Sequence, residues 1–93
     1  MATNPVIYSD LAVPPGVYLT DVAEEMGMSQ AELARRMGRP VQTISEIANG
    51  IKSITPDTAL QLEKVLGVPA HVWTGLEAEY QLTKARNEAS GVV

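Results

Sequence analysis

The stretch SQAELARRMGRPVQTISEIANG, from Ser29 to Gly50, decides the fold of this chain. It holds two short helical patterns on either side of a three-residue Gly-Arg-Pro break. Gly38 is expected to end the first helix, because glycine readily takes the left-handed conformation found just past a helix end. Pro40 is expected to begin the second helix at its first position, where a missing N–H costs nothing. The pattern therefore predicts two helices joined by a short turn.

The first of these helices has its own start signal and its own buried face. Ser29 is a good N-cap, and Glu32 stands three residues later, which is the spacing of a capping box. The helix is therefore predicted to begin at Gln30. Apolar residues follow at i, i+3 and i+4 spacing and predict one buried stripe: Leu33, Ala34 and Met37.

The second helix, predicted from Pro40 to Asn49, carries the most informative pattern. At about 100° per residue, its apolar residues fall on one side: Ile44, Ile47 and Ala48. The opposite arc consists of Val41, Gln42, Ser45, Glu46 and Asn49. A solvated helix face normally carries several Lys and Glu residues, whereas this arc has short polar groups and a single charge.

Such groups match the edges of DNA bases. Gln42 can pair with adenine, Glu46 can accept a hydrogen bond from cytosine, Ser45 can serve either, and Val41 can touch a thymine methyl. Two helices in this arrangement match the motif whose second helix lies in the major groove. We predict that these four residues read duplex DNA; the alternative is an ordinary polar face on a small helical bundle.

Six further side chains are predicted to contact DNA phosphates, from both ends of the first helix, the turn, the second helix and the loop after it: Gln30, Arg36, Arg39, Thr43, Asn49 and Lys52. The formal net charge of −4 opposes a polyanionic partner. However, residues 29–53 hold four basic and two acidic side chains, net +2, and the rest of the chain holds three basic and nine acidic ones, net −6. This distribution predicts a basic DNA face and an acidic back, which is either a platform for a basic partner or a solubilising surface.

The remaining chain predicts an all-α domain of five helices. Residues 1–15 are interpreted as an arm, residues 16–88 as the domain, and residues 89–93 as a flexible tail. A first helix is expected to end at Gly27, a fourth to run from the Thr55-Pro56 start signal to Gly67, and a fifth from Pro69 to about Glu88.

Trp73, Leu76 and Tyr80 on the last helix are the predicted homodimer contact. Trp73 is also suited to close the core of the domain, and that alternative stays open. A dimer would bring two recognition helices to half-sites about one DNA turn apart.

Catalytic, metal and cofactor chemistry are not expected. The chain has no Cys, its single His71 has no companion ligand at helical spacing, and Ser29 and Ser45 lack an activating base. No apolar run approaches the roughly 18 residues that a membrane span needs. We expect a cytoplasmic protein without a membrane partner, and we expect no enzyme activity.

About three quarters of the chain, from Pro15 to about Arg86, resembles the HigA-type antitoxins, a branch of the XRE or lambda-repressor-like domains. The matching segments are PPGVYL at 14–19, SQAELARRMGRP at 29–40, TISEIANG at 43–50, ITPDTALQLEKVLG at 54–67 and HVWTGLEAEYQL at 71–82. The chain departs from the usual family pattern at Val68 and at Thr74-Gly75.

This resemblance implies a homodimeric operator-binding antitoxin that represses its own operon and neutralises a ribonuclease toxin. The last helix also looks like domains at the front of longer, peptidase-fused proteins. An interaction or regulatory module, fused or free-standing, is therefore the alternative function. The polar arc from Val41 to Asn49 favours the DNA-binding interpretation.

Overall fold

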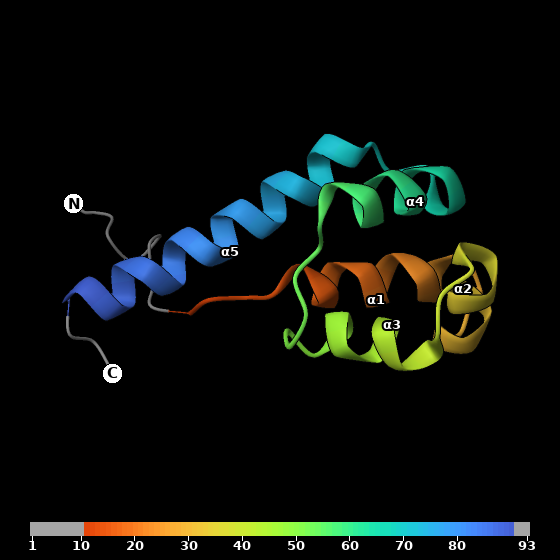
Figure 1. The fold of residues 1–93 in the computed structure, drawn as a ribbon, viewed down its shortest axis with the longest axis horizontal. Helices are drawn as coiled ribbons and strands as arrows, with labels where there is room; N and C mark the ends of the chain where they lie inside the picture. The colour runs from red at the N-terminus through yellow and green to blue at the C-terminus, as the bar shows by residue number, and fades with distance from the viewer. Residues whose placement is uncertain (1–10, 91–93) are drawn as a thin grey trace.

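The computed structural model describes residues 11–90 of the chain. Within this range it contains five α-helices joined by short loops and no strands (Figure 1). Their bounds are Pro15–Glu25 for α1, Gln30–Met37 for α2, Val41–Ala48 for α3, Pro56–Leu66 for α4 and Ala70–Ser90 for α5. The predicted all-α domain with its helix-turn-helix at the second and third helices is confirmed.

The predicted helix boundaries at α2 and α4 follow from local chemistry. Ser29 Oγ accepts a hydrogen bond from the Glu32 N–H at 3.1 Å, and Thr55 caps α4 in the same way at 3.3 Å. Gly38 and Gly67 end α2 and α4 with φ values of 69° and 81°. These are left-handed conformations that glycine adopts without steric penalty.

Two details of the predicted turn motif are wrong. The reciprocal half of the capping box is absent, because the Glu32 carboxylate accepts hydrogen bonds from Arg35 and Arg36 instead of the Ser29 N–H. Pro40 is the N-cap of α3 and not its first residue, because its ψ of 145° is extended and α3 begins at Val41. The fixed φ of proline suits an N-cap as well as a first helical position.

One hydrophobic core joins the five helices, and the predicted stripes of α2 and α3 lie in it except for Ala48, which is half-buried. The largest fully buried side chains are Trp73, Leu19, Leu33, Ile44, Ile47 and Leu62. The Trp73 ring lies 5.4 Å from the Tyr18 ring, and its Nε1–H donates to the Val68 carbonyl at 3.2 Å. Because Trp73 is 0% exposed, its assignment to a dimer contact is wrong and its alternative role in the core is confirmed.

The last helix has two halves with different surroundings. Its first half packs against the body through Trp73 and the partly buried Leu76. Its second half extends past the body (Figure 1), and Leu82 there is 44% exposed. α5 continues to Ser90, two residues beyond the expected end, whereas most of the expected arm and tail, residues 1–10 and 91–93, lies outside the described part of the chain.

Helix α1 crosses α3 at Gly16, and the two helices lie side by side (Figure 1). A Cβ added at Gly16 would stand 2.0 Å from the Ile47 carbonyl oxygen and 2.5 Å from the Ala48 Cα. Both neighbours are backbone atoms and cannot rotate away. The absence of a side chain at Gly16 therefore sets how closely α3 approaches α1.

Substituting Gly16→Ala should destabilise the fold by at least about 2 kcal/mol, because two helix backbones must separate. Gly75→Ala is the matched control. Nothing lies within 4 Å of a Cβ there, and alanine in a helix interior should stabilise by up to about 1 kcal/mol. Urea unfolding followed by Trp73 fluorescence measures both. Equal stability of Gly16→Ala and the wild type would contradict this packing.

Candidate nucleic-acid interface

The outer face of α3 is polar and accessible, as its periodicity predicts. Ile44 and Ile47 are 1% and 2% exposed, whereas Val41, Gln42 and Asn49 are exposed. The other arc residues, Ser45 and Glu46, are half-buried, as is the predicted phosphate contact Thr43 on the flank of the helix. The α3 face thus presents hydrogen-bonding groups to solvent while its apolar side fills the core.

Glu46 is the centre of a small network on this face. Gln42 Nε2 donates to Glu46 Oε2 at 3.4 Å, and Lys52 Nζ lies 3.8 Å from Glu46 Oε1. The Ile51 and Lys52 N–H groups also donate to the Glu46 carbonyl, at 2.8 and 3.2 Å. The loop after α3 is therefore folded back on the helix end, and Lys52 lies beside the predicted base-reading residues.

The remaining residue of the arc, Asn49, is turned back on its own helix. Its Nδ2 donates to the Ser45 carbonyl at 2.9 Å, and its backbone forms the C-cap of α3. The side-chain oxygen has no partner within this network. Asn49 therefore closes the end of the polar face, next to the loop that carries Lys52.

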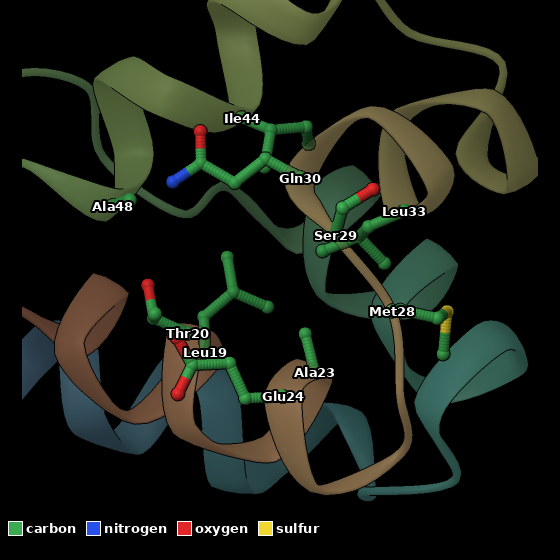
Figure 2. A pocket seen from close by; sticks show the side chains of 10 residues that line it. All are labelled: Leu19, Thr20, Ala23, Glu24, Met28, Ser29, Gln30, Leu33, Ile44 and Ala48. Carbon is green, nitrogen blue, oxygen red and sulfur yellow. The ribbon is translucent and has the colours of Figure 1, made fainter.

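Gln30 is placed beside α3 by the start of α2. Figure 2 shows its side chain reaching across a small pocket toward Ala48 of α3. This pocket, of about 100 Å³, lies between residues of α1, α2 and α3 and is lined mainly by apolar side chains, with Leu19 and Leu33 among them. Gln30 combines an exposed amide with the free N–H groups of a helix start, which is an arrangement that suits a phosphate.

The arginines of α2 are held by an acidic neighbour. Glu32 Oε2 accepts from Arg35 Nη2 at 2.5 Å and from Arg36 Nε at 2.7 Å. The hydrogen bonds from Arg35 and then Arg36 lower the pKa of Glu32 to about 2. The hydrogen bond to Glu32 in turn raises the pKa of Arg35. Arg36, a predicted phosphate contact, thus already has an anionic partner. The i+3 and i+4 spacing of this triad is visible in the sequence.

Arg39 in the turn is held from a distant helix. Its Nε donates to Gln61 Oε1 of α4 at 2.7 Å, across 22 residues of sequence. This bond uses one guanidinium N–H, and the guanidinium has four more that could donate to a phosphate. No local spacing relates Gln61 to Arg39, so sequence reasoning missed this partner.

Among the predicted DNA contacts, the structure joins Gln42, Glu46 and Lys52 in one network. Gln30, at the start of α2, points toward Ala48, and Arg36 and Arg39 are held by Glu32 and Gln61 at the other end of α2 and in the turn. The predicted dimer residues Leu76 and Tyr80 are partly buried on α5, where Lys84 Nζ lies 4.9 Å above the Tyr80 ring. Among the helices of residues 11–90, none has the length and hydropathy of a membrane span.

Comparisons with known proteins agree with this geometry. A family model described as helix-turn-helix matches residues 20–73. The HTH-type transcriptional regulator YddM of Escherichia coli is 30% identical over 71 residues, covering 76% of each chain. An addiction module antidote protein of the HigA family from Coxiella burnetii has 33% identity and a TM-score of 0.75, covering 86% of this chain and 87% of that one.

A further solved structure shows a relative with DNA. The Pseudomonas aeruginosa antitoxin HigA, solved with the higBA promoter, has 30% identity and a TM-score of 0.78, over 87% of this chain and 88% of its own. These similarities confirm the expected likeness to HigA-type antitoxins and the lambda-repressor-like fold.

The Glu32 carboxyl should titrate near pH 2 when followed by NMR, well below the ordinary 4.5. Because the folded pKa is the lower one, the stabilisation by this group is complete above about pH 4.5 and is lost as the pH falls toward 2. Replacing Arg35 and Arg36 by alanine should return the midpoint toward 4.5. An ordinary midpoint in the wild type would contradict the two ion pairs.

Proposed function

The chain belongs to the helix-turn-helix family, and we propose that it is a sequence-specific DNA-binding repressor whose α3 enters the major groove of an operator. The outer face of α3 carries this proposal. Its accessible residues offer hydrogen bonds and one methyl-bearing contact, opposite two isoleucines that fix the helix in the core. Such a face suits base edges better than it suits water or a protein interface core.

Each proposed base contact follows from side-chain chemistry. Gln42 offers an amide that pairs with adenine, and Glu46 offers acceptors for the cytosine amino group. Ser45 between them can serve as donor or acceptor, and Val41 at the helix start can meet a thymine methyl. Because Gln42 already donates to Glu46, the two side chains are arranged as neighbours before DNA arrives.

Phosphate contacts would come from around this face. Thr43 and Asn49 would contribute from α3 and its C-cap, and Gln30 and Lys52 from the neighbouring helix and loop. Arg36 and Arg39 would add further contacts after exchanging or sharing their present partners. These contacts position the domain on the duplex and make binding sensitive to salt.

Replacing Gln42 with alanine should weaken binding at the preferred site by about 1–3 kcal/mol and relax the preference at one base pair in each half-site. The control is Glu63→Ala on α4, which truncates an exposed side chain of the same length outside α3, the loop after it and α5. Selection from a random-sequence duplex pool, followed by titration of the recovered site, measures both effects. Unchanged affinity and preference for Gln42→Ala would rule out this residue as a base reader.

We propose that the protein acts as a homodimer joined through α5. The second half of this helix extends past the body (Figure 1). Leu82 is exposed there, and Leu76 and Tyr80, six and two residues before it, keep part of their surface accessible. Apolar anchors of this kind commonly dominate interfaces. Two joined copies would read two half-sites, which raises affinity for an operator.

Leu82→Asp should therefore convert the protein into a folded monomer with weak operator binding. Leu60→Asp is the matched control, since Leu60 is also exposed, at 57%, but lies on α4. Sedimentation equilibrium gives the mass of each variant, and circular dichroism reports folding. A Leu82→Asp protein that remains dimeric would place the contact elsewhere.

We further propose that the protein is the antitoxin of a type II toxin-antitoxin pair, represses its own operon in the cytoplasm, and neutralises a basic ribonuclease. Support comes from its HigA-like relatives and from the outer side of α1. That side exposes Asp21, Glu24 and Glu25 beside the apolar Val17, Tyr18 and Met26. Acidic charge would steer a basic partner, and the apolar side chains would contribute contact area.

Co-expression with the product of the neighbouring reading frame tests this part. The protein should rescue growth, and Asp21→Asn with Glu24→Gln and Glu25→Gln should reduce the rescue. The control neutralises three exposed acids elsewhere, Glu63, Glu79 and Glu88, by the same Gln substitution. If no neighbouring product is toxic and none co-purifies, the antitoxin role is wrong and the DNA-binding role stands alone.

A further inference from the structure

Glu77 lies on α5 where this helix passes the loop between α3 and α4. Its Oε1 accepts a hydrogen bond from the Ile54 N–H at 2.9 Å, and its Oε2 accepts one from Gln81 Nε2 at 2.7 Å. The Ile54 contact is partly buried and joins residues 23 positions apart. One carboxylate therefore links the proposed dimer helix to the loop that follows the recognition helix.

That loop is fixed at its two ends and open between them. At its start, the Ile51 and Lys52 N–H groups donate to the Glu46 carbonyl of α3. At its end, the Ile54 side chain is 3% exposed in the core while its N–H meets Glu77. Ile51, Lys52 and Ser53 are exposed. Few apolar contacts hold this segment, so its hydrogen bonds decide its conformation.

A second contact from α5 reaches the beginning of the same loop. A Cβ added at Gly50 would stand 3.3 Å from the Tyr80 hydroxyl oxygen and 2.8 Å from Pro14 Cγ, so these groups lie directly over the glycine. Tyr80 follows Glu77 by about one helical turn. Helix α5 thus contacts the loop near both ends, on either side of Lys52.

We propose that Glu77 is a positioning residue for DNA binding, which by accepting the Ile54 N–H holds the loop, and with it Lys52, where the lysine reaches a phosphate. This inference rests on the proposed DNA-binding function. Its physical basis is preorganisation: a lysine on an already ordered loop loses less conformational entropy on binding than one on a loop that must be ordered by DNA. A carboxylate suits the task because it offers only acceptors and bonds strongly to a backbone N–H.

The position of Glu77 gives the contact a wider consequence. The same helix is the proposed dimer contact, so the order of a DNA-contacting loop depends on where α5 lies against the body. Displacing α5 would remove the acceptor of Ile54 and the Tyr80 contact at Gly50 together. Dimer formation and phosphate binding would then reinforce one another through a single rigid helix.

Glu77→Met tests the role of the hydrogen-bond acceptor. Methionine has a similar length and helix propensity, but its sulfur accepts hydrogen bonds only weakly. Glu77→Gln keeps an amide oxygen for Ile54 and should behave like the wild type. Glu79→Met is the matched control, since Glu79 is an exposed acid on the same helix. Glu77→Ala is a second variant without an acceptor, in case methionine disturbs the packing.

Two measurements on the full chain separate positioning from stability. Without DNA, the Ile54 amide should exchange its hydrogen at least about tenfold faster in Glu77→Met than in the wild type. With DNA, the Glu77→Met variant should bind about fivefold more weakly than the wild type. The loss should be the same for the duplex selected by the wild type and for an unrelated duplex. The slope of log Kobs against log salt should also decrease by about one per protomer, as for a lost phosphate contact.

A double-mutant cycle with Lys52→Ala completes the test. Lys52→Ala should weaken DNA binding when it is made in the wild type and have little further effect when it is made in Glu77→Met. The reason is that both substitutions remove the same contact between Lys52 and a phosphate. Additive losses, an unchanged salt slope, or unchanged Ile54 exchange would overturn the proposal. If the wild type binds no duplex at all, the proposed function fails instead, and the Ile54 exchange still reports the hydrogen bond.

Discussion

The burial of Ile44 and Ile47 against α1 is the constraint on which the DNA-facing surface depends. Both side chains are fully buried, and the contact is close because Gly16 leaves room for the Ile47 carbonyl. Once this apolar side is buried, the rotation of α3 about its axis is fixed. The polar arc must then face outward, and it does so as a rigid unit because the core side chains are close-packed. Interface and core are two sides of the same helix.

The basic side chains around the helix-turn-helix are each held by a polar or acidic neighbour. Each basic side chain between Ser29 and Ser53 has a partner: Arg35 and Arg36 on Glu32, Arg39 on Gln61, and Lys52 beside Glu46. Exposed pairs contribute little to stability. Breaking them to form contacts with phosphates would therefore cost little free energy. In the proposed complex, the acidic residues would lower non-specific affinity for DNA, and selectivity would then rest on the bases that α3 reads.

Helix α5 connects the parts of the proposed function. Its first half completes the core with Trp73, its middle reaches the loop after α3 through Glu77 and Tyr80, and its second half extends beyond the body. In the proposed dimer, one element would therefore carry the fold, the DNA-contacting loop and the pairing of two copies. This sharing explains how a chain of 93 residues can combine these roles in one small domain.

The sequence by itself determined the helices and the orientation of α3, because capping residues, glycines and apolar periodicity act within a few residues of one another. Ser29, Gly38, Thr55 and Gly67 set the predicted boundaries for this reason. Only the tertiary structure decided which distant groups meet. Trp73 belongs to the core and not to a surface, Arg39 is held by Gln61, and Glu77 accepts from Ile54. These contacts join residues of different helices, and their existence depends on helix packing in three dimensions, which no spacing along the chain encodes.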